Sequence, residues 1–377
     1  MIKTKVASLV CCLGDIDDPR KASNGTLHDF LEILVIAISA ILSDGDTIED
    51  IAEWGRTKEA WLREFLVLRK GVPSGKTFLR IFPALDPKQF EAAFRRWVAG
   101  VVGALKGVMA VDGKTVRGSG SGGESAIPMV SAFATEWGLV LGQEKVASKS
   151  NEITAIPELL KALSIHGLLV RIDALGCQKS FARQITDQEG DYRLAVKGNP
   201  PGLLAAIEAE FIDQYPLEEV DRHRQVHKSP GRIVAPIASV LPAKGVVDLA
   251  DWPKCKRIGL IDSLRKIGDN ESKLERRYYI LSREWTAEEL AAATRSHWGI
   301  ENRVYWVLDV TFDEDASTVR KGNAPQNFSL LKKIVLNLLR LDTTDKTKCS
   351  LRMERKRAAW DDAIRGHWCI IRHEKLT

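Results

Sequence analysis

The hydrophobic pattern of this 377-residue chain changes after about residue 106, and that change limits how the chain can fold. The first hundred residues carry apolar side chains at helical spacing. The most apolar run there, Phe30–Leu42, contains Glu32 and is too short to span a bilayer. From residue 107 onward, short apolar runs separated by turn residues predict buried strands. We therefore expect a helical unit followed by an α/β unit, with no membrane segment.

The runs between residues 107 and 199 predict the order strand, strand, strand, helix, strand, helix, strand. The strands are expected within the segments 107–118, 129–147 (a hairpin), 168–176 and 192–199, and the helices at 151–163 and 179–189. In this order the first and fourth strands can lie side by side. Residues 202–285 are less regular, with prolines, polar runs and several strand-like pieces.

Two of the predicted strands end in an aspartate that is followed closely by glycine. The first ends in Asp112 and the fourth in Asp173. One such aspartate is ordinarily a turn residue. If the two strands are neighbours, however, two ionised carboxylates would repel each other strongly unless a cation lay between them.

A third carboxylate lies in the run "HWGIENRVYWVLDVTF", residues 297–312, which predicts a buried helix. Tyr305, Leu308 and Phe312 share one helical face, and Glu301 is expected on the same apolar face. Burying a charged carboxylate costs roughly several kcal/mol unless a partner compensates it. Trp298 and Trp306 are interpreted as core residues rather than as base-stacking residues.

A metal ion held jointly by Asp112, Asp173 and Glu301 would compensate all three charges. Ligands that are all oxygen, without a His or Cys cluster, favour Mg²⁺ or Mn²⁺ over zinc. The 6 cysteines show no regular spacing, so neither a zinc site nor a disulfide framework is expected. Reduced thiols fit a cytoplasmic protein.

The formal charge of +5 is unevenly distributed along the chain. Residues 1–100 hold 14 Lys and Arg against 14 Asp and Glu, whereas residues 317–377 hold 14 against 6. This basic end suggests a polyanionic partner, and a solvated basic surface is the alternative. The residues expected to contact phosphates are Arg352, Arg355, Lys356 and Arg357.

Longer motifs resemble a known family. They are "VDGKTVRGS", "LVLGQEKVASKSNEITAIPELL", "IDALGCQK", "LAVKGNPP", "RSHWGIENRVYWVLDVTFDEDAS" and "GNAPQNFSLLKKIVLNLL". Over nearly the whole chain, they resemble the H-repeat-associated insertion-sequence transposases of bacteria, a branch of the DDE superfamily.

The resemblance implies an RNase H-like fold: a mixed five-stranded sheet with flanking helices, and a β-rich insertion before the last catalytic helix. It implies a helical N-terminal domain at 1–105, a catalytic domain at 106–340 with the insertion at about 202–285, and a basic tail at 341–377. It places the catalytic triad on Asp112, Asp173 and Glu301, with two Mg²⁺ or Mn²⁺ ions. The implied partners are the element's terminal inverted repeats and target DNA, bound by a homo-oligomer in the bacterial cytoplasm at the nucleoid.

Several side chains next to the triad are candidates for contact with DNA. They are Lys114, Arg117, Lys179 and His297. The acids Asp309, Asp313, Glu314 and Asp315 are interpreted as helix-capping or solvated residues. Lys76, Thr77 and Arg80 follow a turn as a recognition helix would, and a packing or dimerisation domain is the alternative.

Two other functions remain open from the sequence. A hydrolytic nuclease could share the fold, and a decayed or repurposed copy could bind DNA without cleaving it. The second alternative follows from Pro128, Pro230 and Val234, which stand where the family commonly has other residues. None of these differences removes a carboxylate of the triad.

Overall fold

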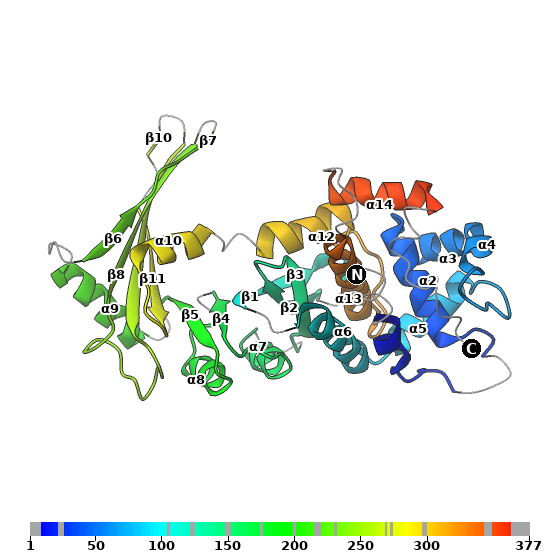
Figure 1. The fold of residues 1–377 in the computed structure, drawn as a ribbon, viewed down its shortest axis with the longest axis horizontal. Helices are drawn as coiled ribbons and strands as arrows, with labels where there is room; N and C mark the ends of the chain where they lie inside the picture. Colours follow the sequence, from blue (N-terminus) through cyan, green and yellow to red (C-terminus); the bar gives the residue numbers. More distant parts are fainter. Residues whose placement is uncertain are drawn as a thin grey trace.

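The structure is a computed structural model with a central sheet, the N-terminal helices at one end and a strand-rich arm at the other (Figure 1). It describes residues 9–21, 26–103, 106–120, 125–147, 152–173, 176–198, 201–214, 220–229, 232–267, 270–271, 274–295, 300–342 and 349–362. Among these residues no helix combines the length and apolar character needed to cross a membrane.

The helices of the N-terminal unit follow the helical spacing of its apolar residues. They are α2 (Phe30–Leu42), α3 (Ile48–Thr57), α4 (Glu59–Leu62), α5 (Gly75–Ala84) and α6 (Pro87–Val102). Thr47 and Asp50 form a capping box at the start of α3, and Asp86 caps α6 ahead of Pro87. Glu32 is buried in α2, where its carboxylate accepts hydrogen bonds from the backbone N–H groups of Val67 and Leu68 at 2.8 and 2.9 Å. Those bonds offset the cost of burying this charge.

Five strands form one half of the sheet, from its edge strand inward, in the order β3-β2-β1-β4-β5. They are β1 (Gly107–Val116), β2 (Ile127–Ala134), β3 (Leu139–Lys145), β4 (Leu168–Ile172) and β5 (Asp191–Val196). β2 is antiparallel to β1 and β3, whereas β4 is parallel to β1 and β5. The prediction that the first and fourth strands are neighbours is therefore confirmed.

The sheet does not stop at five strands, so that part of the fold prediction is corrected. The strands of the 202–285 region continue it, with β11 (Glu275–Leu281) antiparallel to β5 and followed by β9 (Arg257–Ile267), β8 (Arg232–Pro242) and β6 (Asp221–Arg224). The short strands β7 (His227–Ser229) and β10 (Asn270–Glu271) pair with β8 and β9 and complete an 11-stranded sheet. The free N–H and C=O groups on the edge of β5 explain why an inserted strand pairs there.

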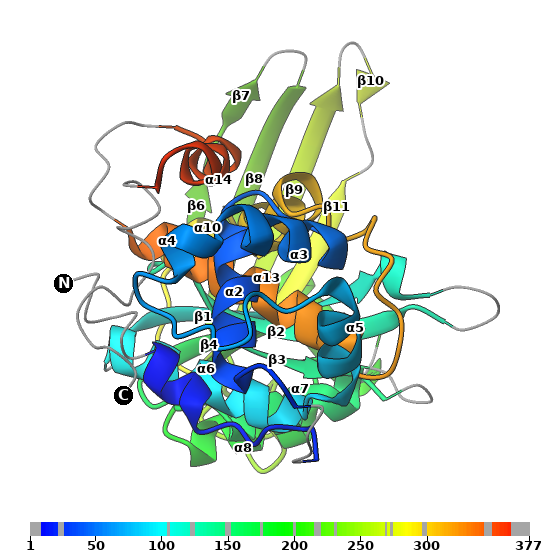
Figure 2. The same ribbon diagram turned by 90° about the vertical axis from the view of Figure 1, so that its right-hand side faces the viewer.

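The remaining helices cover the sheet and connect it to the N-terminal helices. They are α7 (Glu152–Lys161), α8 (Lys179–Asp187), α9 (Pro201–Gln214), α10 (Ala287–Arg295), the π-helical turn η3 (Glu301–Tyr305), α12 (Trp306–Thr311), α13 (Ala324–Leu341) and α14 (Leu351–Trp360). α13 is buried along nearly its whole length and packs against α2, α5, α6 and β3. In Figure 2 the N-terminal helices lie directly over α13.

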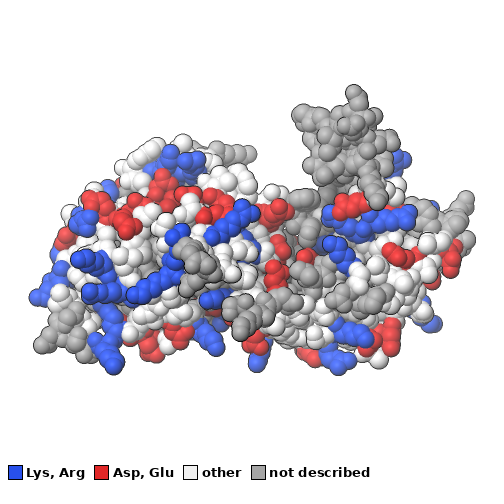
Figure 3. Space-filling view, turned by 180° about the vertical axis from the view of Figure 1, so that it is seen from behind, with Lys and Arg blue, Asp and Glu red and all other residues white. Residues whose placement is uncertain are grey.

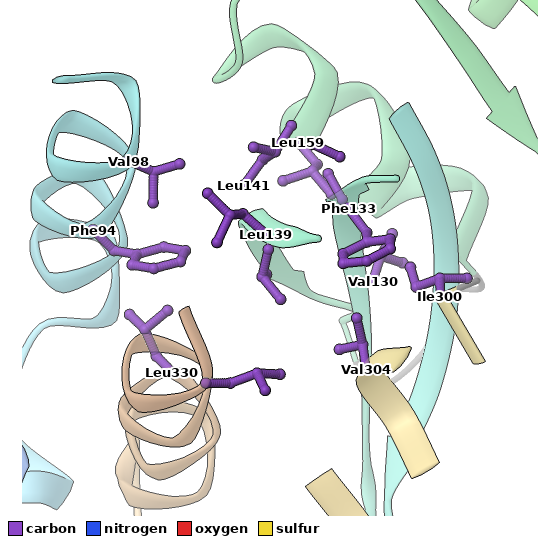
Figure 4. Close-up of a cluster of buried hydrophobic side chains, with 14 of the residues drawn as sticks. Phe94, Val98, Val130, Phe133, Leu139, Leu141, Leu159, Ile300, Val304 and Leu330 are labelled. Carbon is purple, nitrogen blue, oxygen red and sulfur yellow. The ribbon is translucent and has the colours of Figure 1, made fainter. Parts of the chain in front are cut away.

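One apolar core joins α6 and α13 to the sheet and to the helix that follows Glu301 (Figure 4). The members labelled in Figure 4 come from α6, β2, β3, α7, α13 and the 300–304 segment: Phe94, Val98, Val130, Phe133, Leu139, Leu141, Leu159, Ile300, Val304 and Leu330. Because these residues come from both halves of the chain, the N-terminal helices and the sheet share a core rather than touching at a surface.

A buried polar network crosses the same junction. Gln326 and Gln143 donate to the Glu91 carboxylate at 2.8 and 3.2 Å, and the Lys333 ammonium donates to the Gln143 side-chain oxygen at 2.7 Å. Burial raises the pKa of Glu91 to about 7 and lowers the pKa of Lys333 to about 8. The charged form of Glu91 is therefore disfavoured in the folded protein.

Glu91→Gln should stabilise the protein near neutral pH. The pKa of Glu91 in the folded protein, about 7, lies above its usual value of 4.5, so the stabilisation by its protonated form is complete below about pH 4.5 and is lost as the pH rises through about 7. The variant keeps an acceptor for both glutamines and removes this loss. Urea unfolding should show a gain on the order of 2 kcal/mol at pH 7.5 and little gain at pH 5. The exposed Glu158→Gln is the control, and an equal gain at both pH values would contradict the argument.

Candidate active site

Asp112 and Asp173 lie at neighbouring positions of two paired strands. The parallel ladder of β1 and β4 ends with Val111 opposite Ile172. The residue after each of these is an aspartate. Asp112 is not the last residue of its strand, as the sequence suggested, because β1 continues to Val116 as a hairpin with β2. The parallel pairing, rather than the strand end, brings the two carboxylates together.

The charges around Asp112 are mostly negative. Burial raises the pKa of Asp112 to about 7, and the charges of Asp173, Glu152 and Glu301 add to that rise, while a backbone hydrogen bond from Gly113 opposes it. Three other carboxylates therefore lie close enough to act on this one through space. They include both of the other acids that the sequence predicts for the site.

Glu152, at the start of α7, is a fourth carboxylate that the sequence analysis missed. Burial raises the pKa of Glu152, and the charge of Asp173 raises it further. Its carboxylate lies against Gly113, where a Cβ atom would overlap it. An acid in the first turn of a helix is common because it complements the helix dipole, so the sequence carries no signal that distinguishes Glu152 from such a residue.

Glu301 is exposed, so the prediction that it lies within the buried stripe is wrong. In the π-helical turn, the backbone N–H of Trp306 bonds to the carbonyl of Glu301, one residue further back than in an α-helix. The extra residue turns Glu301 away from the stripe of Tyr305, Leu308 and Phe312, all of which are buried. Trp306, also predicted to be a core residue, is 56% exposed.

Tyr305 connects the helical segment to the strand that carries Asp112. Its hydroxyl donates to the backbone carbonyl of Asp112 at 2.6 Å, and its ring is buried. This contact holds the turn that bears Glu301 beside β1. The sequence identified Tyr305 only as a core residue, because a hydrogen bond to a distant carbonyl leaves no local pattern.

The acids provide oxygen ligands of the kind that Mg²⁺ and Mn²⁺ prefer. Within the described ranges, no three His, Cys, Asp or Glu side chains already lie close enough together to hold a metal ion. The four carboxylates are nevertheless a donor set that suits a divalent cation, because burial and the negative charges of Asp173, Glu152 and Glu301 raise the pKa of Asp112 and a bound cation would offset both.

Comparison with known proteins identifies the family. Residues 103–338 match the family described as "Transposase DDE domain", and residues 10–98 match the one described as "DDE_Tnp_1-associated". The chain belongs to the DDE transposase family. The resemblance seen in the sequence motifs is thereby confirmed.

Three bacterial relatives of this DDE family member match nearly its whole length. "Putative protein YbfL" of Escherichia coli (strain K12) is 38% identical over 348 residues, which cover 89% of this chain and 90% of that protein. "H repeat-associated putative transposase YhhI" of the same strain has the same identity and coverage. "Putative transposase YncI" of Escherichia coli O157:H7 is 36% identical over 368 residues, which cover 94% of this chain and 92% of that protein.

Among solved structures, the cryo-EM structure of the piggyBac transposase synaptic complex with hairpin DNA matches with a TM-score of 0.43 and 9% sequence identity. The match covers 97% of this chain and 78% of that one.

Lys114, which the sequence predicts to contact DNA, is held inside the protein instead. Its ammonium lies 2.8 Å from the Glu314 carboxylate and 3.6 Å from that of Asp315, and it also bonds to Asp309. Only 12% of the Lys114 side chain is exposed. Glu314 is buried rather than solvated and also accepts from the Ser329 hydroxyl at 2.8 Å. Both predictions are corrected, because Lys114 on β1 faces this acidic turn.

The other candidates beside the triad remain predictions. Arg117 is 83% exposed and lies 3.7 Å from Asp315, so it stays accessible to DNA. Lys179 begins α8, is about half exposed, and pairs with Asp251 at 2.5 Å. His297 lies outside the described residues.

Of the basic residues in α14, Arg355 is not available to DNA. It is fully buried, and its guanidinium donates to the carbonyl of Ile41 at 2.8 and 3.0 Å and to Asp46 at 2.8 Å. It also lies 4.4 Å from the centre of the Phe312 ring. The prediction for Arg355 is therefore corrected, because this side of α14 packs against the end of α2. Arg352 is exposed, whereas Lys356 and Arg357 are half-buried.

Arg355→Ala should destabilise the protein rather than weaken DNA contacts selectively. The change leaves the Ile41 carbonyl and the Asp46 carboxylate without their donor, which costs on the order of 3 kcal/mol. Urea unfolding measures the loss, and the exposed Arg352→Ala should change the free energy of unfolding by less than about 0.5 kcal/mol. Equal small effects of the two substitutions would contradict the structural role of Arg355.

Proposed function

We propose that this chain is a DNA transposase that binds the ends of its own insertion element and carries out metal-dependent strand cleavage and strand transfer. The observation that carries the proposal is the parallel pairing of β1 and β4, which places Asp112 beside Asp173, in a chain of the DDE family. The charge of Glu301 acts on the same carboxylate and supports it as the third member.

The strand order supports an RNase H-like core. In β3-β2-β1-β4-β5, the first three strands of the chain form an antiparallel meander, and the next two add in parallel on the other side of β1. We assign residues 106–340 to the catalytic domain, with the 202–285 strands as an extension of its sheet. Residues 1–105 form the helical N-terminal domain and residues 341–377 the basic tail.

Asp112, Asp173 and Glu301 would hold the divalent ions, with Glu152 as a further oxygen ligand nearby. When bound, Mg²⁺ activates the attacking hydroxyl and stabilises the leaving oxygen of the scissile phosphate. The chain itself positions the carboxylates: the β1–β4 ladder sets Asp112 beside Asp173, and Tyr305 holds the Glu301 turn against β1. No protein nucleophile would be required: water or a DNA 3′-hydroxyl would attack the scissile phosphorus directly, and the 3′-oxygen of the broken P–O bond would leave.

The proposed partners are the element's terminal repeats and target DNA, bound by several copies of the chain at the nucleoid in a bacterial cytoplasm. A hydrolytic nuclease or a copy that only binds DNA would use the same fold. The separating experiment incubates the full-length protein with labelled element ends, with and without Mg²⁺. Joined products indicate transposition, cleaved products alone indicate a nuclease, and bound but intact DNA indicates a binding protein.

Asp112→Asn, Asp173→Asn and Glu301→Gln should each lower Mg²⁺-dependent cleavage of element ends by a factor on the order of 10³ or more, because metal ligands act as a unit. DNA binding should persist, since each change removes a negative charge from a cluster of like charges. Gel analysis of labelled ends measures both.

Asp309→Asn is the matched control, because Asp309 lies near the site but pairs with Lys114. It should cleave at close to the normal rate once its folding has been verified. Near-normal cleavage by Glu301→Gln together with loss of cleavage by Asp309→Asn would show that the third ligand is misassigned.

A further inference from the structure

A groove of about 520 Å³ lies where the N-terminal helices meet the segment between α12 and α13. One wall is formed by the start of α3 and by α5, and the other by residues 317–321. Figure 2 shows α5 beside this segment. Four cationic side chains line the groove: Lys76 and Arg80 from α5, and Arg320 and Lys321 from the opposite wall.

These four cations differ from three exposed arginines of the N-terminal helices. Arg56, Arg63 and Arg96 each pair with a neighbouring acid. Within the described part of the chain, no ion pair involves the four groove cations, all of which are exposed. Arg320 uses its Nε to donate to the carbonyl of Gly118 at 3.1 Å, which leaves the rest of its guanidinium for a ligand.

The groove also contains two acids, and one of them is compensated. Asp46 accepts a hydrogen bond from Arg355 at 2.8 Å, so its charge is balanced within the protein. Glu49 is exposed at the start of α3. The groove therefore holds four cations and one uncompensated carboxylate. This net positive charge favours the binding of a polyanion. Figure 3 shows Lys and Arg side chains on the half of the rear face that carries the N-terminal helices, with Asp and Glu side chains among them.

The groove is linked to the carboxylate site through the chain. Arg320 bonds to Gly118, and Gly118 lies so close to the backbone of Ser317 that a Cβ atom would overlap it. From Asp112 to the end of β1 at Val116, the strand rises by about 13 Å. That distance is well under one helical turn of DNA, which is about 34 Å. A duplex whose end reaches the carboxylates can therefore also reach the groove.

The concave shape argues against base reading by α5. A recognition helix must project from the surface to enter the major groove of DNA. α5 instead lines a hollow between α3 and residues 317–321, and its exposed Lys76 and Arg80 face that hollow. Cations in such a position can reach the phosphates that stand on the outside of a duplex.

We propose that this groove clamps the sugar-phosphate backbone of the element-end duplex, a short distance inward from the cleaved phosphate. The clamp has one wall from the helical N-terminal domain and one from the catalytic domain, so both domains hold the same DNA. It binds phosphate without regard to sequence, and base recognition lies elsewhere in the protein. The inference rests on the proposed function, because it takes the bound duplex to be the one that is cleaved.

The test measures binding of the full-length protein to an element-end duplex and to a random duplex, by fluorescence anisotropy over a range of salt concentrations without Mg²⁺. Two double variants are compared, Lys76→Ala with Arg80→Ala, and Arg320→Ala with Lys321→Ala. Each pair should weaken binding to both duplexes by a similar factor. Each should also flatten the slope of log K against log salt by up to about 1.8, or about 0.9 per lost phosphate contact.

Arg56→Ala with Arg63→Ala is the matched control, since it removes two exposed but paired cations from the same domain, and it should leave the slope unchanged. The charge-preserving variants Lys76→Arg and Lys321→Arg should keep the normal slope, which separates loss of charge from loss of fold. An unchanged slope in either double variant would overturn the clamp, and so would a loss confined to the element-end duplex.

Failure of the clamp and failure of the proposed function give different results. If Mg²⁺-dependent cleavage requires Asp112 but the slope of log K against log salt is unchanged in the groove variants, the clamp is wrong and the proposed function stands. If both double variants flatten the slope of log K against log salt but the wild-type protein does not cleave DNA, the groove binds DNA and the proposed catalytic function is wrong.

Discussion

The parallel register between β1 and β4 determines where the negative charges of the site lie. Val111 of β1 lies opposite Ile172 of β4, and the next residue in each case is an aspartate. Asp112 is still within β1, whereas Asp173 directly follows the end of β4. Antiparallel pairing or a shift of the register would separate these carboxylates. Burial raises the pKa of Asp112, and the negative charges of Asp173, Glu152 and Glu301 raise it further, so the fold maintains an arrangement that disfavours the charged form of this carboxylate without a cation.

The surroundings of β1 contain several buried charges that support this arrangement. Lys114, two residues after Asp112 in β1, pairs with Glu314, which lies near Lys333 of α13. Lys333 then bonds to Gln143, which bonds to Glu91 of the N-terminal helices. The strand that carries Asp112 is thus connected to the N-terminal helices by a chain of buried polar contacts. Such a connection gives a physical reason for the two family matches, 10–98 and 103–338, to occur together in one chain.

Much of the local structure could be predicted from hydrophobic period and capping residues. The seven elements from β1 to β5 follow the predicted order, and Thr47 and Asp86 cap α3 and α6 as their residue types favour. Features that depend on distant contacts could not be predicted. The π-helical turn that exposes Glu301 and Trp306 requires one extra residue in a helix that looks regular in sequence. Arg355 sits in a basic run and differs from its neighbours only in facing α2.

The central claim is that Asp112 and Asp173 share a divalent cation, and direct measurement of Mn²⁺ binding tests it most sharply. Isothermal titration calorimetry of the full-length protein without DNA should detect Mn²⁺ binding to the wild type. In the same titration, Mn²⁺ binding should be weakened or lost in Asp112→Asn and in Asp173→Asn, and it should be retained in Asp309→Asn. Equal Mn²⁺ affinity in the wild type and both of these carboxylate variants would contradict the account.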